Sequence, residues 1–358
     1  MSATRIGVAG CGKVSHMYLP TLERCPAVEI AGVADVDPAA AKSVAEEYRL
    51  PLAASPDGLL GDPSVEIIVN LTPIAVHVDV TRAALDAGKH VYSEKSLATT
   101  VEEAQGIRAQ AERHGLTVAC APDTLLGSGF QVARAALEGG EIGRTISATA
   151  AMYRGAFSAP TPYTVGPFAF FDMAPYYLSA LVSLLGPATR VSAATRTCKE
   201  GEVPEPGRAG APIMMTGVIE FAEGAMADLT LAWGIDHRSE VTNFKVFGTS
   251  GVLAFPNPNN FGDAALLKRY GEDGWQELPE SRQPEQMRRN LRGIGVAEMA
   301  LAVRVGRTPR ASGELAGHVV DIIGGMVRAG ESGESVALTT TCAVPEPLPA
   351  DARAELFV

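Results

Sequence analysis

A glycine-rich turn between an apolar strand and a helix constrains the fold of this chain more than any other feature. The run Arg5–Ala9 predicts a buried strand, residues 14–24 predict a helix, and Gly10 and Gly12 lie between them. The first glycine permits a tight turn, and the second lets another molecule approach the backbone. A helix N-terminus adds free N–H groups and a partial positive charge. The pattern Gly10-x-Gly12-x-x-Ser15 therefore predicts a site for the pyrophosphate of a dinucleotide.

Short apolar runs alternate with helical patterns through the first 120 residues. Thr100 and Glu103 have the spacing of a capping box, which marks the start of one helix. Strands that alternate with helices of about 10 to 15 residues form βαβ units and a parallel sheet. The expected strands are 5–9, 29–35, 66–71, 90–93 and 117–121, and the expected helices are 14–24, 38–48, 77–87 and 100–114. The sequence predicts a doubly wound Rossmann domain over residues 1–121.

The pattern changes after Pro122, where several strands follow one another without helices between them. Such a succession favours an antiparallel sheet, and the Gly-Thr-Ser-Gly at 248–251 indicates a hairpin. The expected strands are 145–153, 188–198, 213–221, 225–233, 243–247 and 252–255, and the expected helices are 129–138, 172–185, 290–305 and 312–328. At roughly 150 residues per domain, a chain of this length predicts about two domains. We expect the second to span 122–358, with an open and mainly antiparallel sheet.

The composition excludes several classes of function. The 30 basic and 41 acidic residues give a net charge of −11, which argues against nucleic-acid or membrane partners. No run approaches 18 apolar residues, and the N-terminus carries no secretory pattern, so we expect a cytoplasmic protein. The five cysteines form no CxxC pair and are expected to be buried and unpaired. The six histidines show no HxH or HExxH spacing, so no catalytic metal is expected.

Asp35 ends the second expected strand, 23 residues after Gly12. A carboxylate at this position accepts hydrogen bonds from the adenosine ribose hydroxyls and repels a 2′-phosphate. Neither Val36 nor Asp37 offers a cation for such a phosphate, so NAD is favoured over NADP as the cofactor. The alternative is that Asp35 only caps a turn before Pro38. Lys13 and Val14, in the glycine turn, complete the expected pyrophosphate site.

Four further segments make the chain resemble the Gfo/Idh/MocA oxidoreductases, the family of glucose–fructose oxidoreductase and inositol dehydrogenase. They are Thr-Pro-Ile-Ala-Val-His at 72–77, Ala-Gly-Lys-His-Val-Tyr-Ser-Glu-Lys-Ser at 87–96, Phe-Asp-Met-Ala-Pro-Tyr-Tyr-Leu at 171–178 and Arg-Gly-Ile-Gly-Val-Ala-Glu-Met at 292–299. The resemblance implies a Rossmann domain followed by a domain with an open sheet. It also implies hydride transfer between a ring carbinol of a sugar or polyol and a nicotinamide. A homo-oligomer, dimer or tetramer, is expected on the same ground.

The resemblance also implies three catalytic residues. Lys95 matches the active-site lysine, Asp172 matches the aspartate that opens the second-domain helix, and Tyr176 falls where most members carry a catalytic histidine. Asp172 and Tyr176 are four residues apart and share a helix face. A free tyrosine titrates near 10, and a neighbouring ammonium lowers that pKa. Lys95 and Tyr176 are therefore the expected acid–base pair, with Asp172 orienting the substrate or the lysine. The alternative is that Tyr176 only binds sugar at the rim, with Lys95 acting alone.

Several other residues join the expected site. Those expected to contact the cofactor are Thr72, Pro73, His77, Glu94 and Lys95, and those expected to contact the substrate are Lys95, Asp123, Tyr153, Asp172 and Tyr176. Trp233 and His237 are weaker candidates for a sugar pocket.

The predicted function is an NAD-dependent oxidoreductase that acts on a ring hydroxyl or ketone of a sugar, glycoside or cyclitol. Three alternatives remain at this point. One is an NADPH-dependent ketosugar reductase, which Asp35 disfavours. Another is a glycosidase-like enzyme in which tightly held NAD is oxidised and reduced in place. The third is a non-catalytic NAD-sensing protein, which the presence of Lys95, Asp172 and Tyr176 disfavours.

Overall fold

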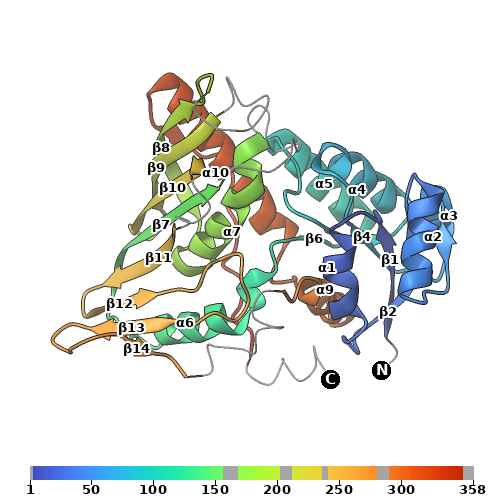
Figure 1. The fold of residues 1–358 in the computed structure, drawn as a ribbon, viewed down its shortest axis with the longest axis horizontal. Coiled ribbons are helices and arrows are strands. Elements are labelled where there is room, and N and C mark those ends of the chain that lie inside the picture. Colours follow the sequence, from blue (N-terminus) through green and yellow to red (C-terminus); the bar gives the residue numbers. More distant parts are fainter. Residues whose placement is uncertain (1–2, 156–167, 202–211, 236–240, 280–289, 350–358) are drawn as a thin grey trace. The chain divides into compact units, whose positions relative to one another are not determined.

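Two compact units make up the chain, and each is described by itself. The computed structural model describes residues 3–155, 168–201, 212–235, 241–279 and 290–349 (Figure 1). The first unit takes Met1–Leu126, Asn290–Gly317 and Leu348–Val358, and the second takes Gly127–Arg289 and His318–Pro347. The sequence analysis placed the domain boundary at 121/122 and assigned residues 290–317 to the second domain. In the structure the boundary lies a little later, at 126/127, and residues 290–317 belong to the first unit.

The first unit is built on a six-stranded parallel sheet. In spatial order its strands are β3 (Ala53–Ala54), β2 (Val28–Ala34), β1 (Thr4–Ala9), β4 (Ile67–Asn70), β5 (His90–Ser93) and β6 (Val118–Cys120). The order 3-2-1-4-5-6 is that of the dinucleotide-binding Rossmann fold. The predicted doubly wound sheet is therefore confirmed, with β3 as an edge strand that the sequence analysis missed.

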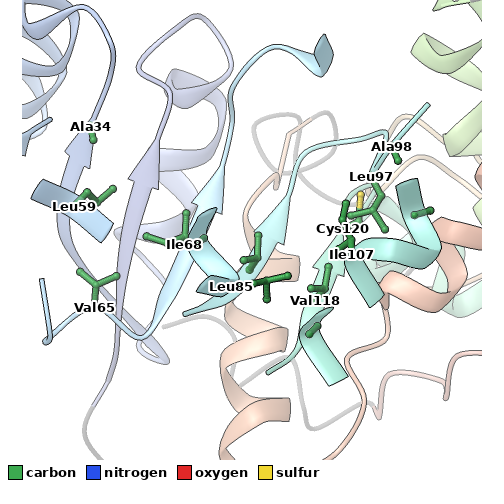
Figure 2. Close-up of a cluster of buried hydrophobic side chains, with 14 of the residues drawn as sticks. Ala34, Leu59, Val65, Ile68, Leu85, Leu97, Ala98, Ile107, Val118 and Cys120 are labelled. Atoms are coloured by element: carbon green, nitrogen blue, oxygen red, sulfur yellow. The ribbon is translucent and has the colours of Figure 1, made fainter. Parts of the chain in front are cut away.

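The helices of this unit follow the strands. They are α1 (Ser15–Leu22), α2 (Pro38–Glu47), α3 (Pro56–Gly61), η1 (Ile74–Val76), α4 (His77–Asp86), α5 (Val101–His114), η2 (Thr124–Leu126) and α9 (Ile294–Arg304). The capping box at the start of α5 is confirmed, because Thr100 and Glu103 bond reciprocally. Figure 2 shows the core between strands and helices, where Ile68 of β4, Leu85 of α4 and Ile107 of α5 are fully buried.

The late segment 290–317 is fastened to the first unit by specific contacts. The Cys120 N–H donates to the Ala311 carbonyl at 2.9 Å, beside the last strand of the sheet. The Asn290 side-chain amide donates to the Met17 carbonyl on α1 at 2.9 Å, and Arg304 Nη2 donates to the Thr4 hydroxyl on β1 at 2.9 Å. These contacts explain why the segment belongs with the Rossmann sheet, although it is distant in sequence.

The second unit is built on a nine-stranded sheet. Its strands in spatial order are β14 (Gln276–Glu277), β13 (Leu266–Arg269), β12 (Gly251–Ala254), β11 (Val241–Gly248), β7 (Thr145–Gly155), β10 (Met226–Ile235), β9 (Pro212–Phe221), β8 (Ala188–Thr197) and β15 (Val336–Ala337). All neighbours are antiparallel except β7 and β10, so the predicted mainly antiparallel sheet is confirmed. The predicted hairpin is the β11–β12 pair.

In the described part of this unit, three helices accompany the sheet: α6 (Ser128–Glu138), α7 (Phe168–Leu185) and α10 (Gly313–Ser332). They lie on the same side of the sheet in Figure 1, and α7 contacts β9 and β10. All five cysteines of the chain are buried and free, as predicted. Of the helices that the structure describes, none combines the length and the apolar character needed to span a bilayer.

Candidate active site

The predicted cofactor residues of the first unit follow the carboxyl ends of four neighbouring strands. Gly10 comes directly after β1, Asp35 after β2 and Glu94 after β5, while Thr72 lies two residues beyond β4. Because these strands are parallel and adjacent, their carboxyl ends meet at one edge of the sheet. Ligands of open α/β sheets bind at this edge, where the strand order reverses between β1 and β4.

The two glycines of the turn have different surroundings. Gly10 has φ +101°, and a Cβ built there would lie 2.8 Å from the backbone carbon and oxygen of Leu71. Glycine is therefore required at position 10 by the fold itself. A Cβ built on Gly12 meets nothing within 4 Å, so the space beside this residue is open.

Helix α1 starts just beyond this open space. Val14, at its N-cap, makes no side-chain hydrogen bond to the first turn. The Ser15 hydroxyl is buried and donates to the Gly12 carbonyl at 2.7 Å, which closes the turn. N–H groups that no N-cap side chain takes up, next to an open backbone position, fit the pyrophosphate of a dinucleotide.

The Asp35 carboxylate is held by two backbone donors. It accepts from the Cys11 N–H at 2.8 Å and from the Asp37 N–H at 2.9 Å, and so links the turn after β1 to the loop after β2. The cap of α2 is Asp37, whose side chain accepts from the Ala39 N–H at 2.9 Å. An ionised carboxylate has about four acceptor positions, so Asp35 retains capacity for ribose hydroxyls after these two bonds.

His77 joins the loops that follow β4 and β5. Its ring is buried, with Nε2 2.6 Å from the Thr72 carbonyl oxygen and Nδ1 2.9 Å from the Ser96 carbonyl oxygen. Burial lowers the pKa of His77, against the opposite effect of these two carbonyls, and favours the neutral ring. A neutral imidazole carries one N–H, so one of the two contacts is the donated hydrogen bond.

Glu94 and Lys95 are both buried at the end of β5, each 8% exposed. The Glu94 carboxylate accepts from the Lys95 backbone N–H at 3.0 Å and from the Tyr18 hydroxyl at 2.6 Å. The Lys95–Ser96 peptide bond is cis. Tyr18 was not among the predicted site residues, because no motif distinguishes it from the apolar residues that surround it on α1.

Asp123 was predicted to contact the substrate. In the structure its carboxylate is 1% exposed and accepts from the backbone N–H groups of Gly293 and Gly295 at 2.9 and 3.0 Å, at the start of α9. Burial raises the pKa of Asp123 to about 6, although both N–H donors act in the opposite direction. These contacts favour a structural role in holding the late segment.

The second unit carries the other predicted catalytic residues on α7. Asp172 is half-buried and Tyr176 is buried, one helical turn further along. The same helix packs on the sheet through Phe170, whose ring centroid lies 5.7 Å from that of Trp233 on β10, and through Met173, whose Sδ accepts from Arg154 at 3.4 Å. Asp172 and Tyr176 are thus fixed by the seating of α7 on its own sheet.

The remaining predicted residues do not lie on α7. Tyr153 is half-buried on β7, opposite Ala232 of β10. The Trp233 indole N–H is buried and has no hydrogen-bond partner among the described residues. His237 lies outside the described residues. Lys95 belongs to the first unit, whereas Tyr153, Asp172 and Tyr176 belong to the second. In the described parts of the chain, no three or more His, Cys, Asp or Glu side chains are grouped to hold a metal ion.

The fold and this edge of the sheet define a dinucleotide-binding oxidoreductase, and sequence comparison agrees. The family model described as "Oxidoreductase family, NAD-binding Rossmann fold" matches residues 4–121, and the "GFO/IDH/MocA C-terminal domain" matches residues 130–254. The chain therefore belongs to the Gfo/Idh/MocA family. It is an NAD(P)-dependent dehydrogenase, as the sequence predicted.

Two named relatives and one solved structure illustrate the membership. D-xylose 1-dehydrogenase (NADP(+)) 2 of Haloferax volcanii is 28% identical over 341 residues, which is 93% of this chain and 98% of the relative. Inositol 2-dehydrogenase of Acidothermus cellulolyticus is 36% identical over 118 residues, 32% of this chain and 34% of the relative. The structure of aldose–aldose oxidoreductase from Caulobacter crescentus, complexed with glycerol, is 20% identical with a TM-score of 0.82 and covers 94% of this chain and all of its own. This last likeness concerns the fold.

Proposed function

We propose that this protein is an NAD-dependent dehydrogenase that oxidises a ring hydroxyl of a sugar, glycoside or cyclitol, or reduces the corresponding ketone. The observation that carries the proposal is the edge of the Rossmann sheet, where Asp35 and Lys95 follow two strands on either side of β1 and β4. The named relatives act on D-xylose and inositol, both small molecules with several CH–OH groups.

In this proposal the residues of that edge hold the cofactor. The turn from Gly10 to Val14, with the backbone N–H groups of α1, binds the pyrophosphate, and Asp35 binds the adenosine ribose. Thr72, Pro73, His77 and Glu94 shape the loops along the rest of the dinucleotide. When bound, the nicotinamide supplies the acceptor or donor of the hydride.

The protein's own residues move the proton. Oxidation of an alcohol requires a base for the hydroxyl proton, and reduction of a ketone requires an acid at the carbonyl oxygen. We assign this role to Lys95 and Tyr176, with the Lys95 ammonium stabilising negative charge on the reacting oxygen. Asp172, one turn before Tyr176, orients the substrate or the lysine, and the half-buried Tyr153 binds a further hydroxyl.

A spectrophotometric screen tests the reaction. The purified protein is incubated with NAD and a panel of monosaccharides, inositols and glycosides, and absorbance of the reduced nicotinamide is followed. We expect saturable reduction with at least one compound that has a ring hydroxyl. Release of an aglycone from glycosides without net NADH would instead assign the reaction to glycoside cleavage.

A second candidate uses NADP, because the relative from Haloferax volcanii is named for NADP(+). A fluorescence titration with NADH and NADPH separates the two. We expect NADH to bind more tightly in the wild type, and Asp35→Asn to reduce that preference, because the repulsion of a 2′-phosphate is removed. Tighter binding of NADPH by the wild type would assign the protein to the second candidate.

A further inference from the structure

A buried hydrogen bond connects helix α1 to the carboxyl end of β5. Tyr18 is on α1, three residues after Ser15, and its side chain is fully buried. The Tyr18 hydroxyl donates to Glu94 Oε1 at 2.6 Å. Burial, reinforced by the neighbouring Glu94 charge, raises the pKa of Tyr18 well above its usual range, so the hydroxyl keeps its proton and remains a donor.

The other oxygen of the same carboxylate holds the backbone of the next residue. Glu94 Oε2 accepts from the Lys95 N–H at 3.0 Å, and the Glu94 N–H itself donates to the Asn70 carbonyl at 2.8 Å. The carboxylate is only 8% exposed, so solvent has little access to replace either donor. Its orientation therefore depends on Tyr18 on one side and on Lys95 on the other.

We propose that Tyr18 is a positioning residue for the reaction: through the Glu94 carboxylate it fixes the backbone of Lys95 to the helix that follows the glycine turn. This inference rests on the role of Lys95 in the proposed function. The first turn of α1 lies beside the open space at Gly12, and Tyr18 is on the same short helix. One helix thus contributes both to the proposed pyrophosphate site and to the placement of the lysine.

The proposal predicts a loss of turnover without a loss of cofactor binding. Displacing a reacting group by about 1 Å can lower the rate by about 10²-fold. Tyr18→Phe keeps the ring and removes only the hydroxyl, so we expect kcat to fall by roughly ten- to a hundredfold. The dissociation constant of NADH should change by less than about threefold, because the backbone of the glycine turn is untouched.

Tyr92→Phe is a matched control. Tyr92 is also fully buried, its ring lies edge-on to that of Tyr18 with centroids 6.4 Å apart, and its hydroxyl has no hydrogen-bond partner among the described residues. We expect this variant to keep kcat within about twofold of wild type. Equal losses of kcat in the two variants, or no loss in Tyr18→Phe, would overturn the proposal.

Two further measurements distinguish a positioning role of Tyr18 from a general loss of structure in the variant. Amide hydrogen exchange, measured in peptides that cover Lys95, should accelerate in Tyr18→Phe and not in Tyr92→Phe. In Glu94→Ala, adding Tyr18→Phe should lower kcat by less than twofold further, because the hydroxyl no longer has a carboxylate to orient. Additive losses would contradict the coupling.

The exchange measurement also distinguishes failure of this inference from failure of the proposed function. If Lys95→Ala retains activity, the assigned role of Lys95 is wrong. Faster exchange at Lys95 in Tyr18→Phe would then still establish the structural link, whereas unchanged exchange would remove the link as well.

Discussion

The two units place their predicted functional residues in different ways. In the first unit they come from loops after four strands, and side chains bridge neighbouring loops: Asp35 accepts from the turn after β1, and the His77 ring lies 2.6 and 2.9 Å from carbonyl oxygens in the loops after β4 and β5. In the second unit, Asp172 and Tyr176 come from a single helix. Where a site is made of loops that contact one another, a change in one residue affects the positions of the others. Where the residues share one helix face, they need only the correct spacing along the helix.

Single positions in the two units differ in what their surroundings allow. Tyr176, predicted to fall where most family members carry a histidine, lies on a helix that also packs on its sheet through other side chains, such as Phe170 against Trp233. In the first unit, Gly10 has no such freedom, because any Cβ there meets the backbone of Leu71.

The largest effect is expected from Lys95→Ala. Loss of the ammonium removes both the charge stabilisation and the proton transfer assigned to this residue, so kcat/KM should fall by at least about 10³-fold. NADH affinity should stay within about threefold. Lys42→Ala, which changes an exposed lysine on α2, is the control and should leave both unchanged. Retention of the wild-type rate in Lys95→Ala would remove Lys95 from the mechanism.

Tyr176→Phe tests the proposed catalytic residue of the second unit. If the phenol transfers the proton, kcat should fall by roughly 10²–10⁴-fold with little change in the KM of the sugar. Tyr177→Phe, one position along the same helix, is the control and should have a small effect. A rise in KM with kcat preserved would show that Tyr176 binds the sugar at the rim and that Lys95 acts alone.

Gly10 and Gly12 allow a comparison within the first unit, between a glycine that the fold requires and a glycine that lies beside open space. Gly10→Ala should lower the free energy of unfolding by about 1–3 kcal/mol or more, because φ +101° and the contact with Leu71 both disfavour a side chain. Gly12→Ala should leave stability within about 0.5 kcal/mol and weaken NADH binding by about ten- to a hundredfold, since its Cβ fills space left for the ligand.

Thermal unfolding and NADH titration of both variants check this prediction. Equal destabilisation by the two substitutions would mean that the fold, and not the ligand, requires both glycines. Unchanged NADH affinity in Gly12→Ala would place the pyrophosphate elsewhere.

The order of the elements could be predicted from sequence because it follows from local patterns. The capping box predicted the start of the helix Val101–His114, which was expected over 100–114, and a short apolar run predicted β5. Shorter elements have weaker patterns: β3 is two residues long, and α3 begins at a proline and ends at a glycine. The sequence analysis missed both.

Contacts between distant segments could not be predicted. Nothing local to the segment 290–317 indicates that it belongs with the Rossmann sheet, because Asp123, the partner of its Gly293 N–H, and Cys120, the partner of its Ala311 carbonyl, lie more than 100 residues away in sequence. The parallel pairing of β7 with β10 was not predicted for the same reason, because these two strands are also distant in sequence. For the candidate site, sequence patterns and the family resemblance predicted Asp35, His77 and Lys95, whereas Tyr18 was identified only from its hydrogen bond to Glu94 in the structure.

Asp123 is expected to affect stability and its pH dependence, and it tests whether the late segment is held by a titrating contact. Its pKa is raised from 3.8 to about 6 in the folded protein. Between these two values the folded state binds more protons than the unfolded chain, so this group's contribution to stability is present below about pH 4 and is lost as the pH rises through 6. A shift of about two pKa units corresponds to about 3 kcal/mol.

Asp123→Asn keeps an oxygen for the N–H groups of Gly293 and Gly295 but removes the titration. The free energy of unfolding, from urea titrations at pH 4, 5, 6 and 7, should therefore decrease with rising pH more steeply in wild type than in the variant, by up to about 3 kcal/mol over this range. Other titrating groups cancel in the difference between the two proteins. A difference that does not change with pH would show that Asp123 is ionised in the folded state throughout, and that its two backbone donors outweigh the effect of burial.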